Sequence, residues 1–158
     1  LINCFIDLIK LYPNYNLIII GEGEDKKKLQ KYINLKNLQE KIFLLNFKNN
    51  IFNYMKNAEC FVLSSLWEDP GWVLIEAASV NTTIISSNCP NGPVEFLSNG
   101  EGGYLFDSNN KKSFLKIFDK YKSDDNKTKY KKLTITKKNV RSYTLFRHYC
   151  DLMKSLKK

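Results

Sequence analysis

The sequence predicts an α/β fold in which a Rossmann-like parallel sheet carries helices on both faces. Three observations lead to this fold class. Short apolar segments rich in β-branched residues recur about every 20–25 residues along the chain. A stretch with helical spacing of its apolar residues lies between each pair of these segments. The segments are apolar throughout instead of alternating with polar residues, which is typical of parallel strands covered on both sides.

The predicted helices and strands alternate from the first residue onward. Ile2, Phe5 and Ile9 repeat at helical spacing, and Pro13 ends that first helix because proline lacks the backbone donor that a helix needs. Helices are expected at 1–11, 24–35, 50–58, 71–79, 92–99, 110–122 and 144–156. Strands are expected at 16–20, 41–47, 60–65, 82–87 and 103–107. Right-handed crossovers between such strands give a doubly wound domain.

This domain is expected to cover residues 1–122, closed by a basic helical tail at 123–158. Residues 123–140 are polar without a clear apolar period and are expected to form a surface excursion before the last helix. Residues 111–158 hold 16 basic and 4 acidic residues, whereas residues 1–110 hold 9 and 12. The lysine-rich last third fits either a solvated face or attraction to an anionic membrane surface or to phosphate.

Composition argues against several classes of protein. The cysteines at 4, 60, 89 and 150 show no CxxC spacing and His148 is the one histidine, so no metal site and no Cys-His or Ser-His-Asp catalysis is expected. The cysteines are expected to be reduced thiols in the cytoplasm. No apolar stretch approaches the roughly 18 residues of a membrane span, and no signal peptide is expected. The chain begins at Leu1 instead of Met, which favours a fragment.

Ligands of open parallel sheets bind beyond the carboxyl ends of the strands, and three unusual loops are predicted there. The first is GEGED, in which Gly21 and Gly23 permit a close approach of a ligand to the backbone. The third glycine of a dinucleotide fingerprint is absent. A tight turn and the edge of a ligand site are both open interpretations. In the third loop, SSNCPNGPVEF, Asn91-Gly92 indicates a turn, Pro93 a helix start and Glu95 an acid near that start.

The second loop, SLWEDPGWVLIEA, carries the strongest indication of a site. Pro70 suits a helix start, and the amides of Gly71, Trp72 and Val73 would then be unpaired donors that suit an anion. Glu76 lies a turn or more further along and can face the same crevice, where its two acceptor oxygens suit a ribose diol. The alternative is that Glu76 caps a neighbouring backbone group or pairs with a lysine.

These motifs resemble those of the family 4 retaining glycosyltransferases, also called glycosyl transferase group 1. The resemblance rests on Glu68 and Glu76 in an E-x7-E pattern, and on the order of the motifs around it. That order is LIIIGEGED, KIFLLNF, AECFVLSS, the E-x7-E helix, TIISSNCPNGPVE and GEGGYLFD. It covers nearly the whole chain. The EDPG and CPNGP variants are similar to those of bacterial enzymes that build cell-surface polysaccharide or lipopolysaccharide.

The resemblance implies the carboxyl half of a GT-B fold, which binds a nucleotide-sugar donor. It implies that Glu76 holds the ribose, and that Glu68, the catalytic residue, contacts the transferred sugar. The other implied donor-binding residues are Asp69, Gly71, Trp72, Val73, Gly21, Gly23 and Asn46. It further implies a UDP- or GDP-sugar donor, a glycan or glycolipid acceptor held by an amino-terminal domain, and no metal or cofactor.

Some positions depart from the family pattern. Asp69-Pro70 replaces the more common Gly-Phe, which leaves the sugar open, and Asn81 stands where a glycine is usual. The strand and loop with the Arg and Lys that clamp the diphosphate are expected before this chain. A fragment of a cytoplasmic glycosyltransferase at the inner face of the cytoplasmic membrane is therefore expected, inactive alone. The alternatives are a non-catalytic nucleotide-sugar-binding module and a basic protein that binds nucleic acid or a membrane surface; nucleic acid is not the expected partner.

Overall fold

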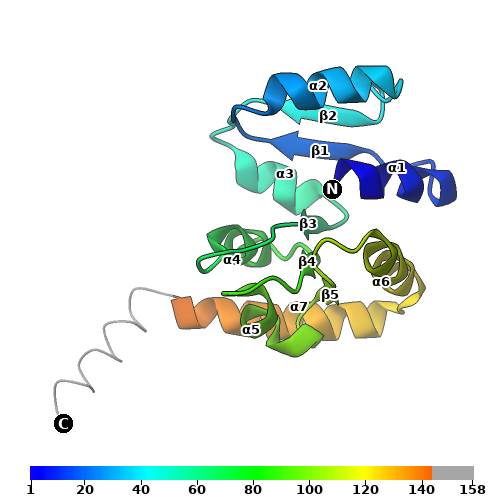
Figure 1. Ribbon diagram of the computed structural model, residues 1–158. Helices are drawn as coiled ribbons and strands as arrows, with labels where there is room; N and C mark the ends of the chain where they lie inside the picture. Colours follow the sequence, from blue (N-terminus) through cyan, green and yellow to red (C-terminus); the bar gives the residue numbers. More distant parts are fainter. Residues whose placement is uncertain (144–158) are drawn as a thin grey trace, which may run out of the picture. The chain divides into compact units, whose positions relative to one another are not determined.

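The computed structural model describes residues 1–143, which divide into two compact units (Figure 1). Unit 1 covers Leu1–Ile51, and unit 2 begins at Phe52. Each unit is a small α/β structure with its own parallel sheet. The predicted helix at 144–156, which includes His148, lies outside the described residues.

Unit 1 confirms the first four predicted elements. They are α1 (Ile2–Leu11), β1 (Leu17–Ile20), α2 (Lys26–Leu35) and β2 (Ile42–Leu45), followed by the start of α3 (Ile51–Asn57). β1 and β2 pair in parallel, with Leu17 opposite Ile42. The Tyr32 hydroxyl donates a hydrogen bond of 2.7 Å to the Asn3 side chain, which ties α2 to α1. Because β1 and β2 are parallel, their carboxyl ends lie at the same edge of the sheet and lead into the loops at 21–25 and 46–50.

Unit 2 contains the other predicted strands and the remaining helices predicted before residue 144, and it adds α7 and two short 3-10 helices. Its elements are β3 (Phe61–Leu63), α4 (Trp72–Ser79), β4 (Ile84–Ser87), α5 (Pro93–Phe96), η1 (Ser98–Gly100), β5 (Tyr104–Phe106), α6 (Lys111–Ser123), α7 (Asn126–Val140) and η2 (Arg141–Tyr143). Asn81, which follows α4, adopts a left-handed φ of 61°, as expected for a residue that replaces glycine there.

The strands pair as two parallel sheets within the described residues, whereas a single sheet was predicted. The order is β1-β2 in one sheet and β3-β4-β5 in the other. The parallel pairing is otherwise the one that the sequence predicts.

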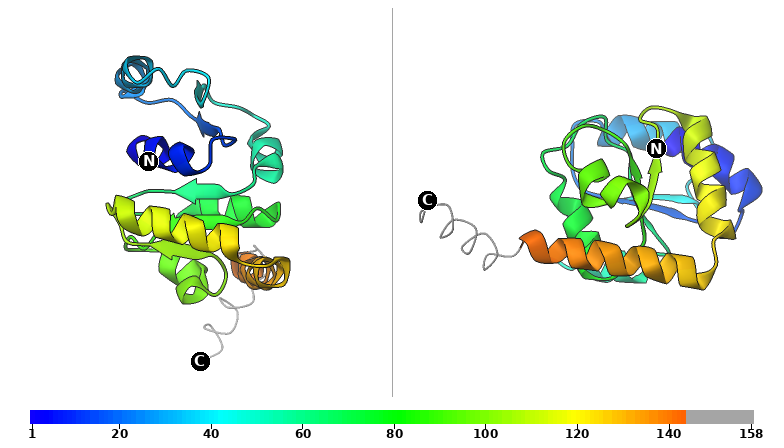
Figure 2. Two further views of the ribbon diagram at one scale, coloured as in Figure 1. Left: turned by 90° about the vertical axis from the view of Figure 1, so that its right-hand side faces the viewer. Right: turned by 90° about the horizontal axis from the view of Figure 1, so that it is seen from below.

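The middle strand of unit 2 is completely buried. Figures 1 and 2 show α4 and α6 on opposite sides of the sheet, as predicted. All four residues of β4 are at most 1% exposed, including Ser86 and Ser87. Both serine hydroxyls donate hydrogen bonds to backbone carbonyls, of Ser87 and Ser65 respectively, so no buried hydroxyl of this strand lacks a partner.

Aromatic side chains fill the space between α6 and β5. Phe106 and Phe114 pack edge to face with ring centroids 5.2 Å apart, and Tyr104 and Tyr121 do so at 5.4 Å. Such pairs contribute about 0.5–1.5 kcal/mol beyond the area that they bury. The hydroxyl of Tyr104 reaches Asp124 at 2.8 Å, and burial together with this carboxylate raises the pKa of Tyr104.

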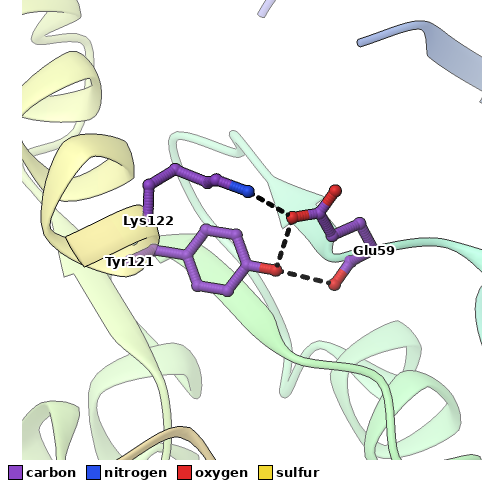
Figure 3. Close-up of polar contacts among 3 residues, drawn as sticks. All are labelled: Glu59, Tyr121 and Lys122. Atoms are coloured by element: carbon purple, nitrogen blue, oxygen red, sulfur yellow. Dashed lines mark hydrogen bonds and ion pairs between the residues drawn. The ribbon is translucent and has the colours of Figure 1, made fainter. Parts of the chain in front are cut away.

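The carboxyl end of α6 is tied to the turn before β3 (Figure 3). Tyr121 donates a hydrogen bond to the Glu59 carbonyl at 3.1 Å, and Lys122 forms an ion pair with the Glu59 carboxylate at 2.8 Å. The next residue, Cys60, has a pKa raised to about 12, chiefly because burial disfavours the thiolate and also because Glu59 is nearby. Cys60 and Cys89 are free thiols.

The prediction of a surface excursion at 123–140 is wrong, because this segment forms the 15-residue helix α7. Its inner face mixes polar residues with the half-buried Leu133, Ile135 and Val140, so the apolar period that marks other helices is weak. Thr136 is 2% exposed, and Lys132 donates to the carbonyl oxygens of Gly100 and Gly103 at 2.5 and 2.9 Å. Asn139 donates to the Phe96 carbonyl at 2.6 Å. These polar contacts replace the hydrophobic stripe of an ordinary surface helix.

Two residues, Asp125 and Gly102, could have indicated the helix α7 at the level of the sequence. Asp125 is the N-cap, and its carboxylate accepts a hydrogen bond of 2.8 Å from the Thr128 amide. Gly102 lies so close to the helix that a Cβ would stand 3.1 Å from the Thr136 methyl group. The assignment of 123–158 as a basic helical tail that closes the domain stays a prediction. Among the helices of residues 1–143, none is long and apolar enough to span a bilayer.

Candidate functional site

The loop from β3 to α4 carries most of the predicted site residues. α4 begins at Trp72, and its N-cap is Gly71, whose φ of 82° favours glycine. The prediction that Pro70 starts the helix is therefore wrong: the left-handed Gly71 separates the two. Pro70 follows a cis peptide bond from Asp69. The Asp69 side chain is exposed.

Three contacts hold this loop against the loop that follows β4. The Ser87 hydroxyl donates to the Ser65 carbonyl at 2.6 Å, and the Glu68 amide donates to the Pro90 carbonyl at 3.3 Å. Gly92, with a φ of 134°, lies directly on the Pro70 carbonyl. The second and third predicted loops thus form one surface at the carboxyl ends of β3 and β4, as the parallel order requires.

Glu68 folds back over the beginning of α4. Its Oε2 atom lies 3.5 Å from the position that a Cβ on Gly71 would occupy, and its Cβ lies 3.6 Å from that position. The side chain is half-buried. A carboxylate near the positive end of a helix dipole is favourable. The structure therefore brings Glu68 and Gly71 together, at the start of the helix that carries Glu76.

Glu76 lies in the middle of α4, four residues after Trp72, and is half-buried. Leu74, Ala77 and Ala78, which surround it in sequence, are buried in the core. Within residues 1–143, no hydrogen bond or ion pair reaches the Glu76 carboxylate; its backbone carbonyl accepts from the Ser79 hydroxyl. The alternatives of a lysine partner or a capped backbone group are thus not seen in this part of the chain.

The backbone amides at the start of α4 lack partners, as the prediction of an anion site requires. In the described part of the chain, no hydrogen bond is found for the amides of Gly71, Trp72 and Val73, and the first amide with a backbone partner is that of Leu74, which donates to Gly71 at 2.9 Å. These three donors, together with the helix dipole, favour a negative group in front of the helix.

The predicted residues of unit 1 also come together, at the carboxyl ends of β1 and β2. The Gly21 amide donates to the Leu45 carbonyl at 3.1 Å, and the Lys26 ammonium bonds to the Asn46 side-chain oxygen. A Cβ on Gly21 or Gly23 would meet no atom within 4 Å, so neither glycine is needed for packing. The φ of 146° at Gly21 does favour glycine. A tight turn and an open ligand edge both stay consistent with this loop.

Two groups of residues near the site escaped sequence reasoning. Trp72 packs edge to face on Tyr143 with ring centroids 6.1 Å apart, and Phe96 packs on the same tyrosine at 5.8 Å. Burial, and the charge of Glu95 in the first turn of α5, raise the pKa of Tyr143. Tyr143 lies 71 residues from Trp72, and no local pattern connects them. Lys26 is the second residue that the sequence analysis did not assign to a site. Its position at the start of α2, directly after the GEGED loop, could have indicated it.

Comparisons with known proteins identify the family of the chain. The family model described as "Glycosyl transferases group 1" matches residues 1–141. An uncharacterized glycosyltransferase of Methanocaldococcus jannaschii is 47% identical over 97 residues, which is 61% of this chain and 24% of that protein. An Escherichia coli UDP-Gal:alpha-D-GlcNAc-diphosphoundecaprenol alpha-1,3-galactosyltransferase is 33% identical over 133 residues, which is 84% of this chain and 33% of that protein.

A solved structure has the same fold. The crystal structure of Anabaena HepE in complex with UDP superposes with a TM-score of 0.82 at 18% identity, over 98% of this chain and 44% of that one. The chain thus spans a quarter to a third of the length of the two curated relatives named above. The matched family model covers well over half of the 158 residues, and the parallel α/β fold is the one that its members share. The chain belongs to the glycosyl transferases group 1 family.

Proposed function

We propose that this chain is the donor-binding part of a retaining glycosyltransferase that transfers a sugar from a nucleoside diphosphate to a cell-surface glycan or glycolipid. The observation that carries the proposal is the arrangement at the start of α4. Three backbone amides without a protein partner lie between Glu68, which folds over Gly71, and Glu76, whose carboxylate has no partner in residues 1–143. Two acids beside an anion site suit a ligand that carries both hydroxyls and phosphates.

Each group then has a role that follows from its chemistry. The Glu76 carboxylate accepts hydrogen bonds from the two hydroxyls of a ribose, and such charge-assisted bonds are about twice as strong as neutral ones. The amides of Gly71, Trp72 and Val73 donate to the diphosphate. As the sugar leaves, negative charge grows on the departing phosphate, and donors that already point at it lower the barrier.

Glu68 is the residue assigned to the transferred sugar. Its carboxylate lies beside Gly71, where it accepts hydrogen bonds from sugar hydroxyls. Asp69 is exposed next to it and is the neighbouring candidate for sugar selection. In unit 1, taken by itself, Gly21, Gly23 and Asn46 are proposed as nucleotide-contacting residues, and the Lys26 ammonium donates to the Asn46 side-chain oxygen.

The donor and the acceptor are named as classes only. The HepE structure is a complex with UDP, and the name of the Escherichia coli relative includes a diphosphoundecaprenol compound. We extend these to a UDP- or GDP-sugar and to a lipid-linked or polymeric glycan, held by a further domain. The proposal uses no metal ion, and it places the enzyme in the cytoplasm, attached peripherally to the inner face of the cytoplasmic membrane.

Calorimetric titration of the purified chain with UDP and GDP tests the donor site. Glu76→Ala removes both ribose acceptors, so the affinity for the preferred nucleotide should fall about tenfold or more. Glu76→Gln keeps one acceptor and should lie between. Glu101→Ala, which removes an exposed acid elsewhere in unit 2, is the matched control and should bind like the parent. Because the chain spans only part of its relatives, sugar transfer by the chain alone is not expected.

The outcomes separate the possible roles of Glu76. Equal affinities for parent and Glu76→Ala would remove the site assignment. A Glu76→Ala variant that melts far below the parent would identify a structural carboxylate. Donor binding without transfer, even when the chain is joined to an amino-terminal domain from a relative, would favour the non-catalytic module.

A further inference from the structure

Helix α7 divides its positive charges between two faces. Residues 126–143 contain seven basic and no acidic residues. Two of the lysines serve the fold: Lys132 donates to the carbonyls of Gly100 and Gly103, and Lys129 lies 4.7 Å from the centre of the Tyr121 ring. Burial lowers the pKa of Lys132, which is the expected direction for an ammonium group on the inner face.

The remaining basic residues follow the opposite face of the helix. We call this set the α7 stripe, and all its members are exposed: Lys127, Tyr130, Lys131, Thr134, Lys137, Lys138 and Arg141. They follow one another at steps of three and four, which places them on one side of an α-helix over about 20 Å. Figures 1 and 2 show α7 lying along the outside of unit 2. The lysines of the stripe therefore form a row on one side of α7, and Arg141 follows in η2.

The acids around α7 lie at its ends or on its inner side. Asp124 and Asp125 precede the first turn, and Asp124 accepts the Tyr104 hydroxyl. Glu101 acts on Lys132 from the inner side, and Glu95 acts on Tyr143 beyond the last turn. No acid of α7 itself interrupts the row, since residues 126–143 contain none. Within residues 1–143, no ion pair cancels the charges of Lys127, Lys131, Lys137 and Lys138.

We propose that the α7 stripe binds the surface of a lipid bilayer that contains anionic lipids. A flat charged plane complements a straight row of cations. Each lysine near such a surface strengthens binding about fivefold. Tyr130, 72% exposed in the middle of the row, has an apolar ring and a polar hydroxyl, which suits the headgroup region. The stripe contains four lysines and one arginine, whereas planar arginines are preferred where phosphates of nucleic acids are gripped in pairs.

The nature of the surface rests on the proposed function, because an enzyme that uses a lipid-linked acceptor works at a membrane. The site itself is separate from the stripe: Glu76 lies on α4, and no stripe residue is assigned to the donor. Donor binding and membrane binding can therefore fail independently. The inference adds the face of the molecule that meets the bilayer.

Cosedimentation with phosphatidylcholine vesicles, with and without phosphatidylglycerol, measures this binding. The 158-residue chain should bind only the phosphatidylglycerol vesicles, and less tightly as salt is added. A variant with Lys127→Gln, Lys131→Gln, Lys137→Gln and Lys138→Gln should bind about six hundredfold more weakly. The double variant Lys127→Gln, Lys131→Gln should lose about twentyfold.

The matched control removes four exposed lysines from α2 and its C-cap. Lys27→Gln, Lys28→Gln, Lys31→Gln and Lys36→Gln change the net charge by the same amount. This control should keep its vesicle affinity within about twofold, because the acids of GEGED precede that helix and no uninterrupted row forms. Circular dichroism confirms that all variants are folded.

Several outcomes would overturn the proposal. An equal loss in the α7 and α2 variants would mean that vesicle binding follows net charge alone. Unchanged binding of the α7 variants would exclude the stripe. Binding of a single-stranded RNA that is lost in the α7 variants, without vesicle binding, would make the stripe a nucleic-acid face. UDP titration of the same variants should be unchanged; loss of UDP binding in Glu76→Ala but not in these variants keeps the two proposals apart.

Discussion

The carbonyl oxygen of Pro70 lies against Gly92 so closely that a Cβ on Gly92 would stand 2.0 Å from it. This contact joins the loop that carries Glu68 to the loop after β4. It allows no side chain between them, and the backbone of Gly92 has a φ of 134°. The shape of the candidate donor site therefore depends on a residue that contacts no proposed ligand.

Gly92→Ala should destabilise the protein by about 2–4 kcal/mol, since a Cβ there both clashes with Pro70 and strains the backbone. The melting temperature should fall, and UDP affinity should fall with it because the Glu68 loop must move. Gly23→Ala is the matched control: its Cβ meets no atom within 4 Å, so its melting temperature should equal that of the parent. A Gly92→Ala variant as stable as the parent would contradict the packing described here.

Lys132→Met should cost about 1–3 kcal/mol in the free energy of unfolding, because it leaves two half-buried carbonyl groups without their donor. The contact of the ammonium with the Tyr104 ring, at 4.8 Å from the centroid, is lost as well. Lys131→Met, one residue earlier on the exposed face, should change stability by less than about 0.5 kcal/mol. Urea titration of both variants checks this; equal midpoints would show that α7 is held by other contacts.

Asp125 should make stability depend on pH at the acid end. Its hydrogen bonds from Thr128 lower its pKa below the ordinary value of 3.8 in the folded protein. The stabilisation is then complete above pH 3.8 and is lost as pH falls through the folded pKa. Asp125→Asn keeps a capping oxygen but cannot titrate. The difference in melting temperature between parent and variant should therefore shrink below pH 3.8; a difference that grows there would contradict this assignment.

Cys60 should resist alkylation at neutral pH. Its pKa of about 12, against an ordinary 9.0, leaves about a thousandfold less thiolate than in an unfolded chain at any pH below 9.0. Iodoacetamide labelling, followed by peptide mass spectrometry in buffer and in urea, measures this ratio. Because the unfolded chain is its own reference, the intrinsic reactivity of the cysteine cancels. Similar rates in both conditions would mean that the thiol is open to solvent.

The strands and apolar helices were predictable from sequence because each buries a continuous run or one regular face. The LIII run of β1 and the apolar positions of α6 are examples, and both elements form within one residue of the predicted bounds. The donor loop was predictable for another reason: Glu68, Gly71 and Glu76 are close in sequence, so one loop and one helix determine how they lie.

The rest depends on contacts that no local pattern encodes. The start of α4 is shifted to Trp72 because Gly71 takes a left-handed conformation, which the sequence permits but does not require. α7 was missed because Lys132 and Asn139 pack through hydrogen bonds to residues about 30–40 positions away. Tyr143 reaches Trp72 in the same long-range manner.

The two faces of α7 should evolve under different rules. On the inner face, Lys132 and Asn139 each donate to particular carbonyl oxygens, so a substitution that keeps the charge or the polarity still loses the geometry. On the outer face only the sign of the charge matters, so lysine and arginine should interchange freely and drift along the helix. In α7, selection should therefore preserve individual residues on the inner face, but only the total positive charge on the outer face.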